Sequence, residues 1–95
     1  MKVATACDTV EVSWEARRQL LERVRGHEGA DAVIARFEMV GTTRPVTGLG
    51  ATGKRLLLAA TTEWVDEAGV GGLPAGVWDL RCALIDDRDG GFWDE

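Results

Sequence analysis

The segment Gly53-Lys-Arg-Leu-Leu-Leu-Ala-Ala-Thr-Thr-Glu-Trp-Val-Asp-Glu-Ala68 predicts the longest helix of the chain. Residues spaced three and four apart form its inward face: Leu57, Ala60, Thr61, Trp64 and Ala68. Gly69 follows directly, at a position where glycine commonly ends a helix. This helix is the most strongly predicted element of the sequence.

Just upstream, Gly48-Leu-Gly-Ala-Thr-Gly-Lys-Arg55 matches a phosphate-binding loop except at its last position, where Arg55 replaces the Ser or Thr that holds magnesium. In that interpretation the backbone N–H groups of Gly48, Gly50 and Gly53 would surround a phosphate, and Lys54 would supply a positive charge. Nucleotide or phosphate binding by these residues is therefore our alternative hypothesis for function.

The residues before this loop argue against the alternative. A phosphate-binding loop follows a buried strand, but residues 42–47 contain a single aliphatic side chain and Pro45, which cannot donate to a strand ladder. We therefore favour a glycine-rich connection that ends at a helix N-terminus, with Thr52 as the capping residue.

Three more helices are expected. Ser13 is a natural cap for a helix over residues 14–25, and a second helix is expected over residues 30–40. Pro74 suits the first turn of a fourth helix that ends near Asp87. The expected inward residues are Ala16, Leu20, Leu21 and Val24 in the first helix, Ala30, Val33, Ile34, Phe37 and Val40 in the second, and Val77, Trp78, Leu80, Cys82, Leu84 and Ile85 in the last.

The predicted fold is mainly α: a compact four-helix domain with at most a minor two-stranded β pairing, of residues 9–12 with residues 44–47. Residues 9–13 alternate between apolar and polar side chains, which is typical of a short strand. We assign residues 1–88 to one helical domain and residues 89–95 to an acidic, aromatic C-terminal tail. A chain of 95 residues leaves no room for a second domain.

The chain is acidic, with a formal net charge of −5. Residues 1–48 carry seven basic and seven acidic side chains, whereas residues 49–95 carry four and nine, so the excess negative charge lies in the second half. Such a surface repels phosphates, and we expect no nucleic-acid partner. No apolar run reaches the length of a membrane span or signal segment, so we expect a cytoplasmic protein without membrane contact.

No catalytic or metal-binding set is visible. The chain has one histidine, one serine and two widely separated cysteines, which do not form a nucleophile–base arrangement or a metal motif. We therefore expect no catalytic residues, no metal and no cofactor, and we do not favour an enzyme.

The four tryptophans are the remaining signal, because tryptophan anchors either a core or an interface. Trp64 and Trp78 lie on inward faces, whereas Trp14 opens the first helix as a staple or an exposed anchor. Trp93 lies in the acidic C-terminal segment, which is typical of a docking peptide for a basic or apolar groove. The residues expected to bind a partner are Asp86, Asp87, Asp89, Phe92, Trp93 and Trp14.

We therefore predict a small acidic protein-binding module of the adaptor, inhibitor or immunity-type class. Its expected partner is another protein with a basic or apolar groove. A homo-oligomer is the third possibility, which would need an exposed Trp14 or Trp78.

Overall fold

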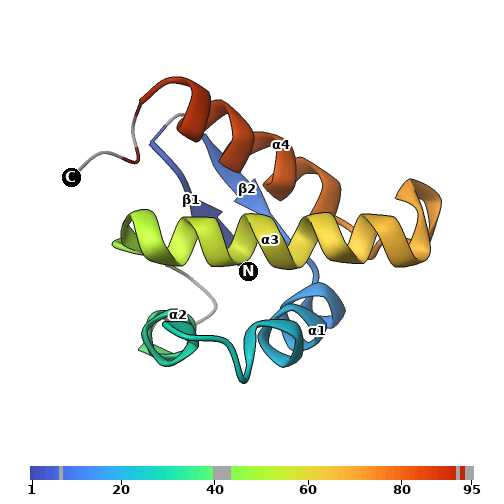
Figure 1. The fold of residues 1–95 in the computed structure, drawn as a ribbon, viewed down its shortest axis with the longest axis horizontal. Coiled ribbons are helices and arrows are strands. Elements are labelled where there is room, and N and C mark those ends of the chain that lie inside the picture. The colour runs from blue at the N-terminus through green and yellow to red at the C-terminus, as the bar shows by residue number, and fades with distance from the viewer. Residues whose placement is uncertain (7, 40–43, 92, 94–95) are drawn as a thin grey trace.

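The computed structural model describes residues 1–6, 8–39, 44–91 and 93 (Figure 1). Over these residues it is mainly helical with a minor antiparallel pairing, which confirms the predicted fold class. The elements, in chain order, are β1 (Lys2–Ala4), β2 (Thr9–Glu11), α1 (Trp14–Val24), α2 (Ala30–Met39), α3 (Gly50–Ala68), a 3-10 turn η1 (Val70–Gly72) and α4 (Val77–Asp89).

Helix α3 is the element around which the others pack. In Figure 1 it runs across the front of the molecule, with α4 above it, α1 and α2 below it, and the strands behind. Its buried residues are Gly53, Leu57, Ala60, Thr61 and Trp64. The buried hydroxyl of Thr61 donates to the carbonyl oxygens of Leu57 and Leu58, both at 3.0 Å, so it does not leave an unpaired polar group in the core.

The first turn of α3 differs from the prediction. The helix begins at Gly50, its N-cap residue is Leu49, and Thr52 lies inside it rather than capping it. Glycine suits position 53 of α3 because α2 approaches closely there: a methyl group added at Gly53 would lie 3.3 Å from Cγ2 of Val33. At the other end, Ala68 was expected to face inward but is exposed.

Helices α1 and α2 lie where the sequence predicts them. The side chain of Ser13 accepts a hydrogen bond from the Ala16 N–H at 3.1 Å and caps α1. All four inward residues expected in α1 are buried. In α2, Ala30, Val33 and Phe37 are buried and Ile34 is half-buried. The expected end of α2 at residue 40 lies outside the described residues.

The predicted pairing of residues 9–12 with residues 44–47 is wrong. Strand β2 pairs with β1 instead, with Val3 opposite Val10. Val46 lies on the other side of β1 as a single parallel bridge to Val3, held by the bonds Ala4 N–H to Val46 O (2.9 Å) and Val46 N–H to Lys2 O (2.8 Å). The N-terminal residues therefore separate the two segments, because strands close in sequence form a hairpin more readily than distant ones.

Helix α4 begins after a tight approach to β2. Its N-cap, Gly76, has φ +92°, and a methyl group there would lie 2.7 Å from the Cα of Val12. This geometry requires glycine. Trp78, predicted to be buried, is 38% exposed. Of the other residues predicted to face inward, Val77, Leu80 and Leu84 are buried, and Cys82 and Ile85 are half-buried.

The expected tail is not separate where it is described. The boundary between residues 88 and 89 falls inside α4. Trp93 is 6% exposed and belongs to the hydrophobic core.

Candidate functional site

A groove of about 780 Å³ follows the outward face of α3 and is bounded at one end by the C-terminal part of α4. We call it the α3 groove. Its lining residues are Arg55, Leu58, Ala59, Thr62, Glu63, Asp66, Arg88, Gly91 and Trp93. The volume falls in the range of ligand-binding clefts in proteins.

Helical periodicity explains why six of these residues share one wall. Positions 55, 58, 59, 62, 63 and 66 are spaced three, one, three, one and three apart, which places them on one face of a helix. The buried residues of α3 occupy other faces, where the neighbouring helices cover them. From Arg55 to Asp66 the wall extends about 16 Å, at 1.5 Å per helical residue.

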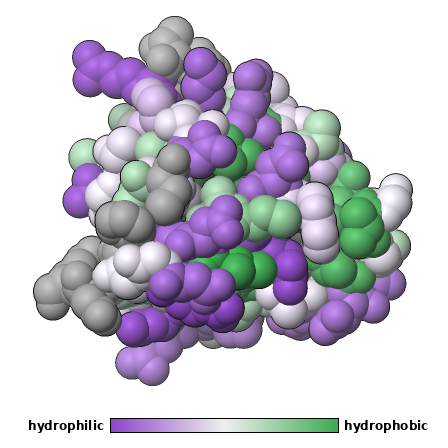
Figure 2. Space-filling model, turned by 90° about the horizontal axis from the view of Figure 1, so that it is seen from above, coloured by the Kyte–Doolittle hydropathy of each residue, from purple (hydrophilic) through white to green (hydrophobic). Residues whose placement is uncertain are grey.

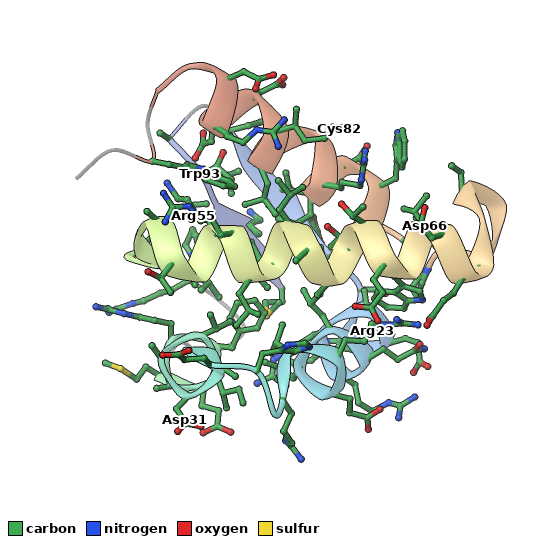
Figure 3. All side chains as sticks on the ribbon, viewed as in Figure 1. Arg23, Asp31, Arg55, Asp66, Cys82 and Trp93 are labelled. Atoms are coloured by element: carbon green, nitrogen blue, oxygen red, sulfur yellow. The ribbon has the colours of Figure 1, made fainter. Side chains whose placement is uncertain are left out.

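The second wall is built by the end of α4 and the residues after it. Gly91 has φ +79°, a conformation suited to glycine, and it redirects the chain so that Trp93 returns to the core. Figure 3 shows Trp93 beside Arg55, between α3 and the end of α4. The buried Nε1 of Trp93 has no hydrogen-bond partner within the described part of the chain.

A buried ion pair fixes the two walls relative to each other. The Nζ atom of Lys54 lies 3.0 Å from Oδ2 of Asp87, which is fully buried. The backbone N–H of Ala6 donates to the same oxygen at 3.0 Å. One carboxylate therefore joins α3, α4 and the segment after β1. A hydrogen bond from Arg81 Nε to Thr62 Oγ1, at 3.3 Å, also links the middle of α4 to the middle of α3.

The groove has charged ends and an apolar middle. Arg55 lies at the end where α3 begins, and Asp66 lies towards its C-terminus (Figure 3). Arg88 follows Asp87, the partner of Lys54, and so belongs to the first end, whereas Glu63 lies one turn before Asp66. Leu58 and Ala59 supply the apolar surface between these ends, and the largely buried ring of Trp93 lies beside Arg55.

Three charged residues of α3 that line the groove lack an ion pair among the described residues. No described residue forms an ion pair with Arg55, Glu63 or Asp66, whereas Arg88 contacts its neighbour Asp89 at 3.3 Å.

The glycine-rich segment does not have the geometry of a phosphate-binding loop. Gly48 and Gly50 have positive φ, of 70° and 68°, but Gly53 lies inside α3 and packs against α2. The described residues just before it, 44–47, contribute the bridge at Val46 but no strand. Lys54, the expected phosphate ligand, has its ammonium group on Asp87.

The residues expected in an acidic docking tail are dispersed. Asp87 is buried on Lys54, and Asp89 is exposed at the end of α4 beside Arg88. Asp86 lines a smaller cavity of about 360 Å³, together with residues of β2 and α4. Trp93 is buried, which corrects its expected exposure, and Phe92 lies outside the described residues.

Trp14 and Trp78 lie apart from the α3 groove. Trp14 is 55% exposed, and the guanidinium groups of Arg17 and Arg81 lie over the rings of Trp14 and Trp78, at 5.4 and 5.3 Å from their centroids. Seen from the α4 side, hydrophobic colour gathers at the end of the molecule where α3 is followed by η1, and Val70 of η1 is 54% exposed (Figure 2).

Sequence reasoning missed the groove residues of α3. Their signal was present, because the stripe from Arg55 to Asp66 alternates with the inward residues at helical spacing. Whether that stripe is covered depends on where α4 lies, which the periodicity of α3 does not specify.

The described residues include no cluster of His, Cys, Asp and Glu able to hold a metal ion. None of their helices is long and apolar enough to cross a membrane. Comparison with protein-family models, curated proteins and solved structures finds no match.

Proposed function

We propose that the protein is a binding module that receives a segment of another protein in the α3 groove. The observation that carries this proposal is the outward face of α3, whose apolar middle and charges without an ion pair among the described residues lie along one wall of the groove. Protein–protein interfaces commonly combine an apolar centre with a polar or charged rim, and this face of α3 has both.

The shape of the groove favours a protein segment over a compact ligand. It is open, and its α3 wall extends for about three helical turns. An amphipathic helix laid in such a groove inserts apolar side chains at positions i, i+3, i+4 and i+7. Leu58, Ala59 and Trp93 would receive those side chains.

This proposal keeps the protein-binding class expected from the sequence but changes the surface. Asp87 and Trp93 are buried, so they do not form an exposed docking peptide with the other acids of the segment. In the proposed mode this chain supplies the groove, and the partner supplies the inserted segment.

A matched pair of substitutions tests the proposal. Ala59 and Ala32 are both exposed helical alanines, but only Ala59 lines the groove. Peptides of about 14 residues, long enough for nearly four helical turns, would be selected from a displayed library on the unaltered protein. Their affinities would then be measured by fluorescence anisotropy for the Ala59→Glu and Ala32→Glu variants.

We expect Ala59→Glu to weaken binding by about tenfold or more, because a carboxylate would be buried against apolar side chains. Ala32→Glu should change the affinity by less than about twofold, as expected for an exposed site outside the interface. Equal effects of the two variants, or no selected peptide above background, would show that the groove is not the binding surface.

A further inference from the structure

The charges along the α3 groove have an order that opposes the preference of a helix. A helix is stabilised by acidic residues in its first turn and basic residues in its last turn. Helices α1, α2 and α4 follow this rule, with Glu15 and Arg23, Asp31 and Arg36, and Asp79 and Arg88 respectively. Helix α3 has no acidic residue in its first turn and no basic residue in its last.

The last turn of α3 carries Asp66 and Glu67 instead. Glu67 is compensated by Arg23 of α1, at 2.6 Å, and faces away from the groove. Asp66 has no such partner in the described chain, and Glu63 lies three residues before it on the same face. Like charges at this spacing destabilise a helix. A cation bound at the acidic end of the groove would offset this repulsion.

The opposite end of the groove is positively charged and would favour an anion. Arg55 lacks an ion-pair partner among the described residues, and Arg88 has only the exposed carboxylate of its neighbour Asp89. An anion placed between Arg55 and Arg88 would meet two guanidinium groups, which bind carboxylates well.

From this order we propose that the occupant is an amphipathic helix with an acidic N-terminal end and a basic C-terminal end, lying parallel to α3. The inference rests on the proposed function. Such a helix carries its charges in the order that its own dipole favours. In the parallel direction its acidic side chains lie against Arg55 and Arg88, and its basic side chains lie against Glu63 and Asp66.

Two displayed libraries test this orientation. Both encode helical peptides of about 14 residues with identical composition and randomised apolar positions. One has acidic residues at the N-terminal end and basic residues at the C-terminal end, and the other has the reverse order. Binders are selected on the unaltered protein and retained only if Ala59→Glu weakens them.

We expect the acid-to-base library to be enriched about tenfold over the reverse library at low salt, with the preference shrinking as salt screens the contacts. The double variant Arg55→Glu, Asp66→Arg keeps the net charge and should reverse the preference. Arg18→Glu, Glu22→Arg swaps an exposed pair of α1 in the same way and should leave the preference unchanged.

The outcomes separate the two claims. If retained binders show no charge order, or favour the reverse order, the orientation is wrong and the groove remains the binding site. If no binder is sensitive to Ala59→Glu, the proposed function fails as well. If the protein forms dimers in sedimentation equilibrium that Ala59→Glu dissociates, the occupant is a second copy, and the helical partner is overturned.

Discussion

Helices α1 and α3 both expose a charged face, but the two faces are built in opposite ways. On α1, Glu15 lies 2.7 Å from Arg18, Arg18 lies 3.7 Å from Glu22, and Gln19 donates to Glu15 at 2.6 Å. The partners in these contacts are three or four residues apart, so the charged side chains are paired within the helix. On the outward face of α3, Arg55, Glu63 and Asp66 have no ion pair within the described chain.

The difference separates a solvated surface from a binding surface. On α1, Glu15, Arg18 and Glu22 are paired within the helix, and Arg23 is paired with Glu67 of α3. The charges of α3 that face other helices are also matched, Lys54 by Asp87 and Glu67 by Arg23. Within the described part of the chain, the charges of α3 that lack an ion pair are those in the groove, where a partner would supply the missing charges.

The largest expected effect concerns the inner ion pair of α3. Lys54→Met would leave the buried carboxylate of Asp87 without its cation, and we expect the free energy of unfolding to fall by about 3 kcal/mol. Arg18→Met, which removes an exposed ion pair of α1, should have little effect. Urea denaturation of both variants gives the comparison, and similar losses would show that the Lys54 contact is no more important than a surface pair.

A smaller, opposite effect is expected at the C-terminal end of the groove. Asp66→Lys would place a base in the last turn of α3 and remove the repulsion from Glu63, so it should stabilise the protein by about 0.5 to 1 kcal/mol. The same change at Asp31, in the first turn of α2, should destabilise it. Thermal unfolding of the pair measures the signs. A destabilising Asp66→Lys would contradict the claim that α3 carries charges unfavourable to its own stability.

The smallest effect is the pH dependence of α1. Hydrogen bonds from Arg18 and Gln19 lower the pKa of Glu15 below its ordinary value of 4.5. Because the pKa is depressed in the folded state, this contribution to stability is present above about pH 4.5 and is lost as the pH falls through the folded pKa. Glu15→Gln should therefore reduce the difference in melting temperature between pH 6 and pH 3. An unchanged difference would show that Glu15 does not contribute to the pH dependence of stability.

Much of the fold was predictable from local patterns. The buried stripe and cap of α1, the buried face of α2 and the core position of Trp64 all follow from helical spacing. The errors arose where distant segments meet. Strand β2 pairs with β1 rather than with residues 44–47, and the periodicity of residues 9–13 does not specify its partner.

The groove was less predictable for the same reason. Trp93 was assigned to an exposed tail because little in the adjacent sequence could bury it, but the turn at Gly91 returns it to the core. Lys54 was assigned to a phosphate site from a motif, although its partner Asp87 is more than thirty residues away in the chain. The absence of partners for Arg55, Glu63 and Asp66 could only be seen once the neighbouring elements were placed.

The most direct test of the account is a map of backbone amide chemical shifts while an acid-to-base helical peptide from the selection is titrated into the ¹⁵N-labelled protein. We expect the shift changes to concentrate at Leu58, Ala59 and Thr62 and at the indole N–H of Trp93. The outward face of α1, at Arg18 and Glu22, should be unaffected. Changes concentrated on α1, or around Trp14 and Trp78, would contradict the claim that the unpaired face of α3 is the binding surface.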